Sequence, residues 1–387
     1  ASRNLLNRSF PIQNAQSVPA DVLAEWRNQY IASNGTLNPA NQLVPNPFQP
    51  SSGLLLPFTG ALGAETIARQ NTYFPYPLLI GSNAAVNSSF ARADYHSMQL
   101  RVARRFSDGM MFDAHYTWSK ALDDTDTHED NQGFNAGGTS RNYDLYNLKN
   151  NRRISHSDIP HRFVGTFLYD LPFGNDKPLE IPNGVLRAIV GDWQLGGSVI
   201  WQTGFPIGIS GASNGAALPR PDRVEGVPMV LPENLWGWYD GRTRVTLPSG
   251  RIITPPANSY LKYNPDAFAG RVVRTPNGSV VADQFWFGNA ALTYDEIRTD
   301  NRFNIDLSIR RSFRISRATL EIGADAMNVL NHTQFSGSYT GALGGTNLAT
   351  NAALGLAPGM GSANNYGTRN MATFNPRQVQ LRAALRF

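Results

Sequence analysis

The sequence predicts an all-β fold in which long antiparallel strands form a transmembrane β-barrel. Three observations predict it: segments that alternate apolar and polar residues, a regular alternation of short and long connections, and a composition rich in turn formers. Of 387 residues, 35 are Gly and 25 are Pro, whereas 16% are charged and 11% are aromatic. This profile is typical of many strands separated by turns and irregular loops.

Composition also excludes several classes of protein. The chain has no cysteine, so a disulfide framework, a thiolate metal site and a cysteine nucleophile are excluded. No run approaches the roughly 18 consecutive apolar residues of a membrane helix, which excludes helical insertion. The net charge of +5 comes almost wholly from Arg residues that are dispersed and form no basic stripe, so no nucleic-acid partner is expected.

Seven segments alternate with period two and are predicted as strands. Their ranges are about 96–106, 109–119, 162–173, 193–203, 302–313, 319–330 and 377–387. The alternation gives each strand an oily face, which includes Leu100, Phe167, Leu195 and Leu307. We expect this face to contact hydrocarbon lipid rather than a packed protein interior.

The predicted strands have the length and the aromatic ends of membrane strands. Each holds about 10 to 12 residues, against about 5 or 6 in soluble proteins. At a tilt of about 40°, that length spans the roughly 25 Å apolar band of an outer membrane. Aromatic residues fall near the strand ends, as interfacial girdles require: Tyr116, Trp118, Phe163, Phe173, Trp193, Trp201, Phe303, Phe313 and Phe387. The predicted location is therefore the cell outer membrane.

The connections between these strands alternate in length. The short ones are 107–109, 174–192 and 314–318, and the long ones are 120–161, 204–301 and 331–376. Outer-membrane barrels keep short turns in the periplasm and long loops outside. The long connections are therefore expected outside the cell, and so are residues 1–94, as a long extracellular loop region. A small helix is expected around Val185 to Val190.

Seven strands cannot close a bacterial single-chain barrel, which has an even number from eight upward. Open edges are not tolerated in lipid. We therefore expect the carboxy-terminal part of a larger barrel, or a chain that pairs with another chain. An eighth strand near Asn71 to Ile80 is an alternative that Pro75 and Pro77 disfavour. The opening ASRNLL, without Met or a visible signal peptide, indicates a removed start or a piece of something larger.

Five stretches resemble the carboxy-terminal barrel of TonB-dependent outer-membrane receptors of the Oar-like kind, which carry a carboxypeptidase-regulatory-like domain. They are YHSMQLRVARRFSDGMMFDAHYTWSKALDD (95–124), HRFVGTFLYDLPFG (161–174), GDWQLGGSVIWQTGFPIGIS (191–210), LEIGADAMNVLNHTQF (320–335) and PRQVQLRAALRF at the end. The resemblance covers nearly all of 95–387, whereas 1–94 matches less sharply. It implies a barrel of 22 strands, of which these seven would be the last.

The same resemblance implies further parts. A barrel-assembly signal would lie in the last strand, at Val379, Leu381, Leu385 and Phe387, with Ala383 a weaker member. The resembling receptors close the lumen with a plug and receive energy through a TonB box, and this sequence contains neither. The plug, the remaining strands and the link to the TonB system would therefore come from a missing amino-terminal part or another chain.

Two clusters offer candidate metal ligands. The stretch DDTDTHED (123–130) supplies hard oxygens that could bind Ca²⁺ from Asp123, Asp124, Asp126, Glu129 and Asp130. Its spacing misses the EF-hand pattern, so solvated loop acidity is the alternative. His156, Asp158 and His161 could serve Zn²⁺, with a strand lead-in as the alternative. No other cofactor is expected.

One cluster of aromatic residues offers a candidate ligand site. LWGWYD (235–240) places Trp236, Trp238 and Tyr239 in a very long external loop. Exposed rings can stack on sugars or capture apolar ligands, because their faces bury much area at little entropic cost. Packing of the loop against a neighbouring loop is the alternative.

No enzyme is expected, because the sequence has no GxSxG, HExxH or GxxxxGK[ST] motif. The leading hypothesis is a receptor or transporter whose loops bind a ligand that then passes through a plug-gated lumen. Polar positions between the apolar ones would form the lumen wall: Arg101, Asp113, His115, Asp306, Arg310, Glu321, Asp325, Arg382 and Arg386. A cell-surface structural or adhesive protein without transport is the second hypothesis, and a soluble β-sandwich or propeller-like binding module is the third.

Overall fold

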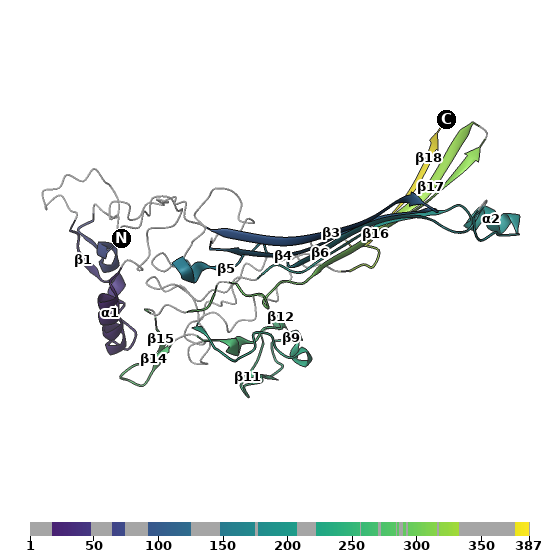
Figure 1. Ribbon diagram of the computed structural model, residues 1–387. Coiled ribbons are helices and arrows are strands. Elements are labelled where there is room, and N and C mark those ends of the chain that lie inside the picture. Colours follow the sequence, from purple (N-terminus) through teal and green to yellow (C-terminus); the bar gives the residue numbers. More distant parts are fainter. Residues whose placement is uncertain are drawn as a thin grey trace.

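The computed structural model is dominated by one sheet of long, bent antiparallel strands (Figure 1). It describes residues 18–47, 64–73, 92–124, 148–174, 177–206, 222–255, 257–269, 272–283, 285, 289–291, 293–315, 317–332 and 376–386. The long strands are β3 (Ala93–Ser107), β4 (Met110–Asp123), β6 (His161–Asp170), β7 (Gln194–Gln202), β16 (Arg302–Ile315), β17 (Ala318–Met327) and β18 (Gln378–Arg386). The expected all-β, antiparallel class is confirmed.

The spatial order of the long strands follows the chain. The order is β18-β17-β16-β7-β6-β4-β3, and short β5 (Arg153–Ile154) extends the sheet beside the end of β4. Within the described residues, β3 pairs only with β4 and β18 pairs only with β17. In this part of the chain, the sheet therefore has two free edges, and each is formed by a long strand.

The register keeps the two predicted faces separate across the whole sheet. On the apolar face, direct partners run Phe112↔Phe167↔Gly197↔Leu307↔Ala326↔Val379. On the polar face they run Asp113↔Thr166↔Ser198↔Asp306. Because a slip of one residue would exchange the faces, the pairing is the one that the alternation demands.

The apolar face has no second layer over it in the described part of the chain. Leu100 is 56% exposed, and Phe167, Leu195 and Leu307 are partly buried, none of them fully. A soluble sandwich would bury these positions against a second sheet. The face is therefore available to an apolar solvent.

The strand ends differ from the ranges expected from the alternation. β3 and β4 run further than expected, because they stay paired as far as Ala93↔Asp123, and β16 does so because it stays paired with β17 as far as Ile315↔Ala318. β17 ends at Met327, because Asn328 takes a left-handed φ of 48°. β6 ends at Asp170, two residues before Pro172, which has no N–H for a ladder. Alternation shows which residues share a face, but not where a ladder stops.

The short connections lie at one end of the sheet, which we call the short-turn end. β3 and β4 join there through Asp108 and Gly109, with φ of 52° and 75°, as a two-residue type I′ turn requires. The expected small helix is present as α2 (Gly184–Val190), between β6 and β7. Figure 1 shows α2 beyond the strand ends, at the opposite end of the molecule from α1.

The amino-terminal segment holds a helix that was not expected. α1 (Ala20–Ala32) precedes η2 (Pro39–Asn41), the strand pair β1 (Leu43–Pro45) with β2 (Thr66–Ala68), and η5 (Arg69–Tyr73). The helix buries Trp26 and Tyr30, one turn apart, in a cluster that includes Phe285. The alternative strand near Asn71 to Ile80 begins in η5 instead, and its remainder lies outside the described residues.

The long connection between β7 and β16 forms a compact loop module, defined here by the described residues within 222–300. Its short antiparallel pairs are β8 (Asp222–Arg223) with β13 (Phe268–Ala269), β9 (Gly237–Asp240) with β12 (Ala257–Leu261), β10 (Val245–Thr246) with β11 (Ile252–Ile253), and β14 (Val272–Arg274) with β15 (Val280–Ala282). Single turns of 3-10 helix lie at η8 (Glu233–Leu235) and η9 (Pro265–Ala267), and another, η7 (Leu148–Asn151), precedes β5.

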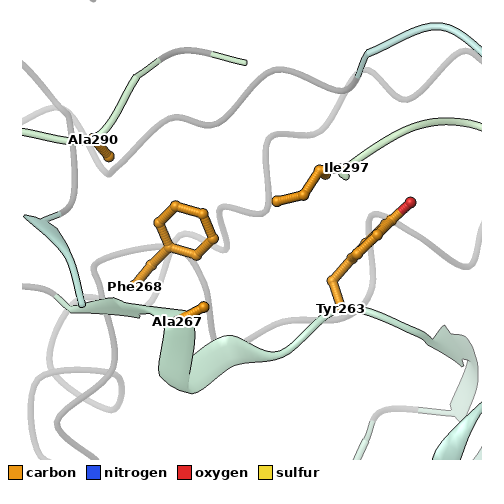
Figure 2. Packing of buried hydrophobic residues seen from close by; sticks show 5 residues of the cluster. All are labelled: Tyr263, Ala267, Phe268, Ala290 and Ile297. Carbon is orange, nitrogen blue, oxygen red and sulfur yellow. The ribbon is translucent and has the colours of Figure 1, made fainter. Parts of the chain in front are cut away.

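The loop module has apolar cores of its own. Figure 2 shows one of them, formed by Tyr263, Ala267, Phe268, Ala290 and Ile297. A second core consists of Leu231, Val245, Leu247 and Leu261. Within the described residues, no helix is long and apolar enough to cross a membrane.

Candidate functional site

The polar face of the sheet carries paired charges. Arg101 donates to both carboxylate oxygens of Asp113, from Nε at 2.9 Å and from Nη2 at 2.7 Å. His115 Nε2 lies 3.0 Å from Asp113 Oδ1. At the other edge, Arg382 Nη1 lies 3.8 Å from Asp325 Oδ2. The two Arg–Asp pairs join neighbouring strands, whereas His115 and Asp113 both lie on β4. These charges therefore link adjacent strands and line one side of the sheet.

A chain of side-chain hydrogen bonds continues this wall toward the short-turn end. Arg310 Nε donates to Gln194 Oε1 at 2.7 Å, and Gln194 Nε2 donates to Asp170 Oδ1 at 2.7 Å. Lys177 Nζ completes the chain with Asp170 Oδ2 at 3.2 Å. These neighbours come from four segments, so the polar face is an ordered surface rather than a set of isolated side chains.

The apolar face ends in an aromatic row near the long connections. Tyr116, Phe163, Trp201 and Phe303 are direct partners across β4, β6, β7 and β16. Further along β16, Phe313 marks the short-turn end of the same face. Ten residues separate the two Phe positions, which is about 25 Å along a membrane normal at a tilt of about 40°. The face therefore has the height of a lipid bilayer's apolar band.

A charge cluster attaches the loop module to the sheet. The carboxylate of Asp158 is fully buried, and its Oδ2 accepts from Arg298 Nη2 at 2.6 Å. Its Oδ1 accepts from the backbone N–H of Ala121, at 2.5 Å. Arg298 Nη1 also donates to the Gly204 carbonyl at 3.1 Å. One guanidinium thus joins the connections that follow β4 and β7.

The outer part of this cluster is more exposed. Asp295 pairs with Arg298 and with Lys120 Nζ, the latter at 2.8 Å. Partial burial raises the pKa of Asp295, but the hydrogen bonds and charges of Lys120 and Arg298 outweigh it, so that the pKa lies below its usual range. Tyr263, a core residue of the loop module, receives a hydrogen bond from the Arg298 backbone N–H at 3.0 Å. The module core and the sheet are therefore connected through Arg298.

Comparison with known proteins decides the class. A family model described as an outer membrane beta barrel domain matches residues 10–380. The chain belongs to the outer membrane beta barrel domain family. No curated protein and no solved structure matches this chain. The protein is therefore located in the outer membrane, its apolar face contacts lipid, and the hypothesis of a soluble binding module is wrong.

The candidate Ca²⁺ ligands lie only partly in the described residues. Asp123 ends β4, with its Oδ1 3.8 Å from Arg153 Nε, and Asp124 Oδ1 accepts from the Arg92 backbone N–H at 2.7 Å. Asp126, Glu129 and Asp130 lie outside the described residues. Over the described ranges, no group of three or more His, Cys, Asp or Glu side chains is arranged for a metal ion. Calcium binding at this loop stays a prediction.

The candidate Zn²⁺ ligands do not converge. The carboxylate of Asp158 already accepts hydrogen bonds from Arg298 and from the Ala121 backbone N–H. His161 Nδ1 lies 2.7 Å from the Tyr116 hydroxyl, and its ring stacks between Tyr116 and Trp201 at centroid distances of 6.2 and 6.4 Å. His161 therefore belongs to the aromatic row, and the strand lead-in was the better interpretation.

Two of the three candidate aromatic ligands pack inside the loop module. Trp236 Nε1 donates to the Leu231 carbonyl at 2.7 Å, and Tyr239 donates to the Leu235 carbonyl at 2.9 Å. Both rings lie against the second core, and burial raises the pKa of Tyr239. The backbone of Trp238 pairs with Tyr260. Trp236 and Tyr239 are partly exposed, and Lys262 Nζ lies over the Trp236 ring, 5.1 Å from its centroid. Ligand contact there stays a prediction.

The candidate assembly signal lies on the free edge strand. Val379, Leu381 and Leu385 occupy the apolar face of β18 and are all exposed, whereas Phe387 lies outside the described residues. Sequence reasoning missed Arg298 altogether. Its partner Asp158 was selected as a metal ligand, and only the unusual density of polar residues before β6 could have pointed to a buried charge.

Proposed function

We propose that the chain is the carboxy-terminal barrel segment of a TonB-dependent outer-membrane receptor or transporter of the Oar-like type. The loop module and neighbouring external loops bind a ligand, which then passes through a lumen gated by a plug. In a barrel of 22 strands, the seven long strands β3, β4, β6, β7, β16, β17 and β18 would be the last seven, and their polar face would line the lumen.

One observation carries this proposal: among the described residues, a membrane sheet with an ordered, charged face has two free edges. An apolar face in lipid leaves the opposite face for water or for a protein plug, which is what a lumen holds. Free edges in lipid leave backbone groups unpaired at several kcal/mol each, so further strands are required. These strands belong to the same polypeptide or to another chain.

The attached loop module supports a receptor role. Outer-membrane barrels have short periplasmic turns and longer extracellular loops, so the module faces the outside. Its own cores and the Arg298 cluster hold it in a defined position. A positioned surface binds a ligand at a lower entropic cost than a mobile loop does. The candidate contacts are the exposed parts of Trp236 and Tyr239.

The test is isolation of the tagged chain from native outer membranes in mild detergent. Mass spectrometry should find a plug sequence with it, in the same polypeptide or as a second chain. The isolated assembly should also bind the periplasmic domain of TonB. An assembly that contains further strands but neither a plug nor TonB binding would overturn the transport proposal and favour the structural or adhesive alternative.

A further inference from the structure

The helix α2 carries an apolar surface that the fold leaves uncovered. Four of its seven residues are large and apolar, and their exposed fractions are 72% for Val185, 54% for Leu186, 64% for Ile189 and 41% for Val190. At about 100° per residue, these positions lie within one arc of about 140°. Arg187 and Ala188 lie outside the arc. We call these four side chains the apolar arc of α2.

Local sequence explains why a helix forms here. The Asn183 side chain caps it by accepting from the backbone N–H groups of Val185 and Leu186, at 2.9 and 3.1 Å. The helix ends at Gly191, whose N–H bonds to the Arg187 carbonyl at 2.9 Å, before Asp192 with a φ of 56°. A helix this short is unstable alone in water, so its surroundings must stabilise it.

Two residues of the apolar face hold the carboxyl end of α2. Trp193 directly follows the turn, and its Nε1 donates to the Ile189 carbonyl at 2.8 Å. Arg311 lies between Ile309 and Phe313 on the apolar face of β16, where it is 7% exposed. Its Nη1 donates to the Ala188 carbonyl. An Arg on the lipid-facing side of a strand destabilises a barrel. The Arg311 side chain is instead bound to the backbone of α2.

Arg311 also contacts the residue that follows the end of α2 and a neighbouring ring on β16. Its Nη2 lies 3.6 Å from Asp192 Oδ2, and its guanidinium carbon lies 4.5 Å from the centroid of the Phe313 ring. The positive charge therefore lies at the negative end of the helix dipole. The helix is attached to the lipid-facing side of the wall, at the level where Phe313 and Trp193 mark the membrane boundary.

We propose that α2 is an interfacial helix whose apolar arc inserts into the periplasmic leaflet of the outer membrane, among phospholipid acyl chains. The arc is continuous with the lipid-contacting face, because both helix attachments come from that face. The short-turn end is the periplasmic end. A short helix with one apolar face lies in the interface plane with that face among the acyl chains. The proposal rests on the outer-membrane assignment and not on transport.

The test uses the absence of cysteine from the sequence. Single-cysteine variants Leu186→Cys and Ile189→Cys report on the apolar arc, and Arg187→Cys is the matched control on the opposite face. Each variant of the whole chain is extracted from native outer membranes and returned to phospholipid vesicles. All three positions are exposed, so the substitutions leave the packing unchanged. Heat-modifiable migration on gels checks that each barrel is folded.

The readout is quenching of a small fluorophore on the cysteine by phospholipids with brominated acyl chains. The labels at positions 186 and 189 should be quenched several-fold more than the label at 187. Equal quenching at the three positions would overturn the proposal. So would weak quenching at all of them together with photo-crosslinking from position 189 to protein in native membranes, because a protein partner would then cover the arc.

A second variant tests the attachment. Trp193→Phe keeps the ring but removes the donor to the Ile189 carbonyl. The label at 189 is measured with lipids whose bromine atoms lie at different depths along the acyl chain. In the Trp193→Phe variant, its quenching should depend less on that depth than in the variant that keeps Trp193, because the helix is held by Arg311 alone. An unchanged depth profile would contradict the assignment of Trp193 as a positioning residue for α2.

Discussion

Arg298 places its guanidinium 2.6 Å from the fully buried carboxylate of Asp158, a residue 140 positions earlier in the chain. The pair joins the loop module to the connections that follow β4 and β7. This attachment determines where the loop module lies relative to the sheet.

Replacement of Arg298 should release the loop module while the barrel stays folded. Arg298→Ala leaves the Asp158 carboxylate buried with only the Ala121 amide, which costs about 3–5 kcal/mol for a broken buried pair. Hydrogen exchange at the backbone amides of Phe205 and Thr299 should accelerate, whereas exchange within β6 should not. The control is Lys120→Ala, which removes only an exposed partner worth about 0–1 kcal/mol. Equal effects of both variants would contradict a special role for Asp158.

The attachment should weaken in acid. Because the pKa of Asp295 is lowered in the folded protein, its contribution is present above the unfolded-state pKa of about 3.9 and is lost as pH falls through the folded value. Thermal unfolding of the loop module, followed by near-ultraviolet circular dichroism, should occur at lower temperature as pH falls below about 4. Asp295→Asn should lower the unfolding temperature at neutral pH. It should also reduce the further fall in unfolding temperature that occurs in acid. An unaltered pH profile in Asp295→Asn would disprove the assignment.

A charge at the middle of the apolar face should destabilise the barrel. Leu307 lies between Phe303 and Phe313 on β16, so Leu307→Arg places a guanidinium near the bilayer midplane, at about 2–4 kcal/mol. Ser308→Arg is the control, since it points to the polar face beside Asp325. Urea unfolding of the protein in vesicles measures both. If the two variants cost the same, the assignment of the faces is wrong.

A glycine in β7 should not accept a side chain. A Cβ at Gly197 would lie 2.7 Å from the Phe167 ring and 2.9 Å from the Asp306 carbonyl oxygen. Gly197→Ala should therefore cost about 1–3 kcal/mol through overpacking and should reduce the amount of heat-modifiable, folded barrel. Gly237→Ala is the control, because nothing lies within 4 Å of its Cβ position. Wild-type stability of Gly197→Ala would show that Phe167 can move aside.

The helix α1 shows why local periodicity failed in the amino-terminal segment. A two-faced strand has period two, whereas ADVLAEWRNQYIA has its two buried rings, Trp26 and Tyr30, four residues apart. Their packing partner Phe285 is contributed from the loop module, and Arg27 pairs with Asp283 at 2.7 Å. Such a helix is stabilised by contacts far away in the chain, which a single window of sequence does not contain.

By itself the sequence determined the two faces of the sheet, the approximate positions of its long strands and the outer-membrane class, because alternation and strand length are local properties of the sequence and the pairing register follows the alternation. Only the tertiary structure decided the roles of Asp158, His161 and Arg311. Their partners come from other connections or from neighbouring strands. Asp158 and His161, which the sequence offered as metal ligands, lie in a buried ion pair and an aromatic row, and Arg311, to which the sequence assigned no role, holds a helix. The physical reason is that the role of a charged side chain depends on the groups it contacts, and a partner far away in the chain leaves no pattern in the local sequence.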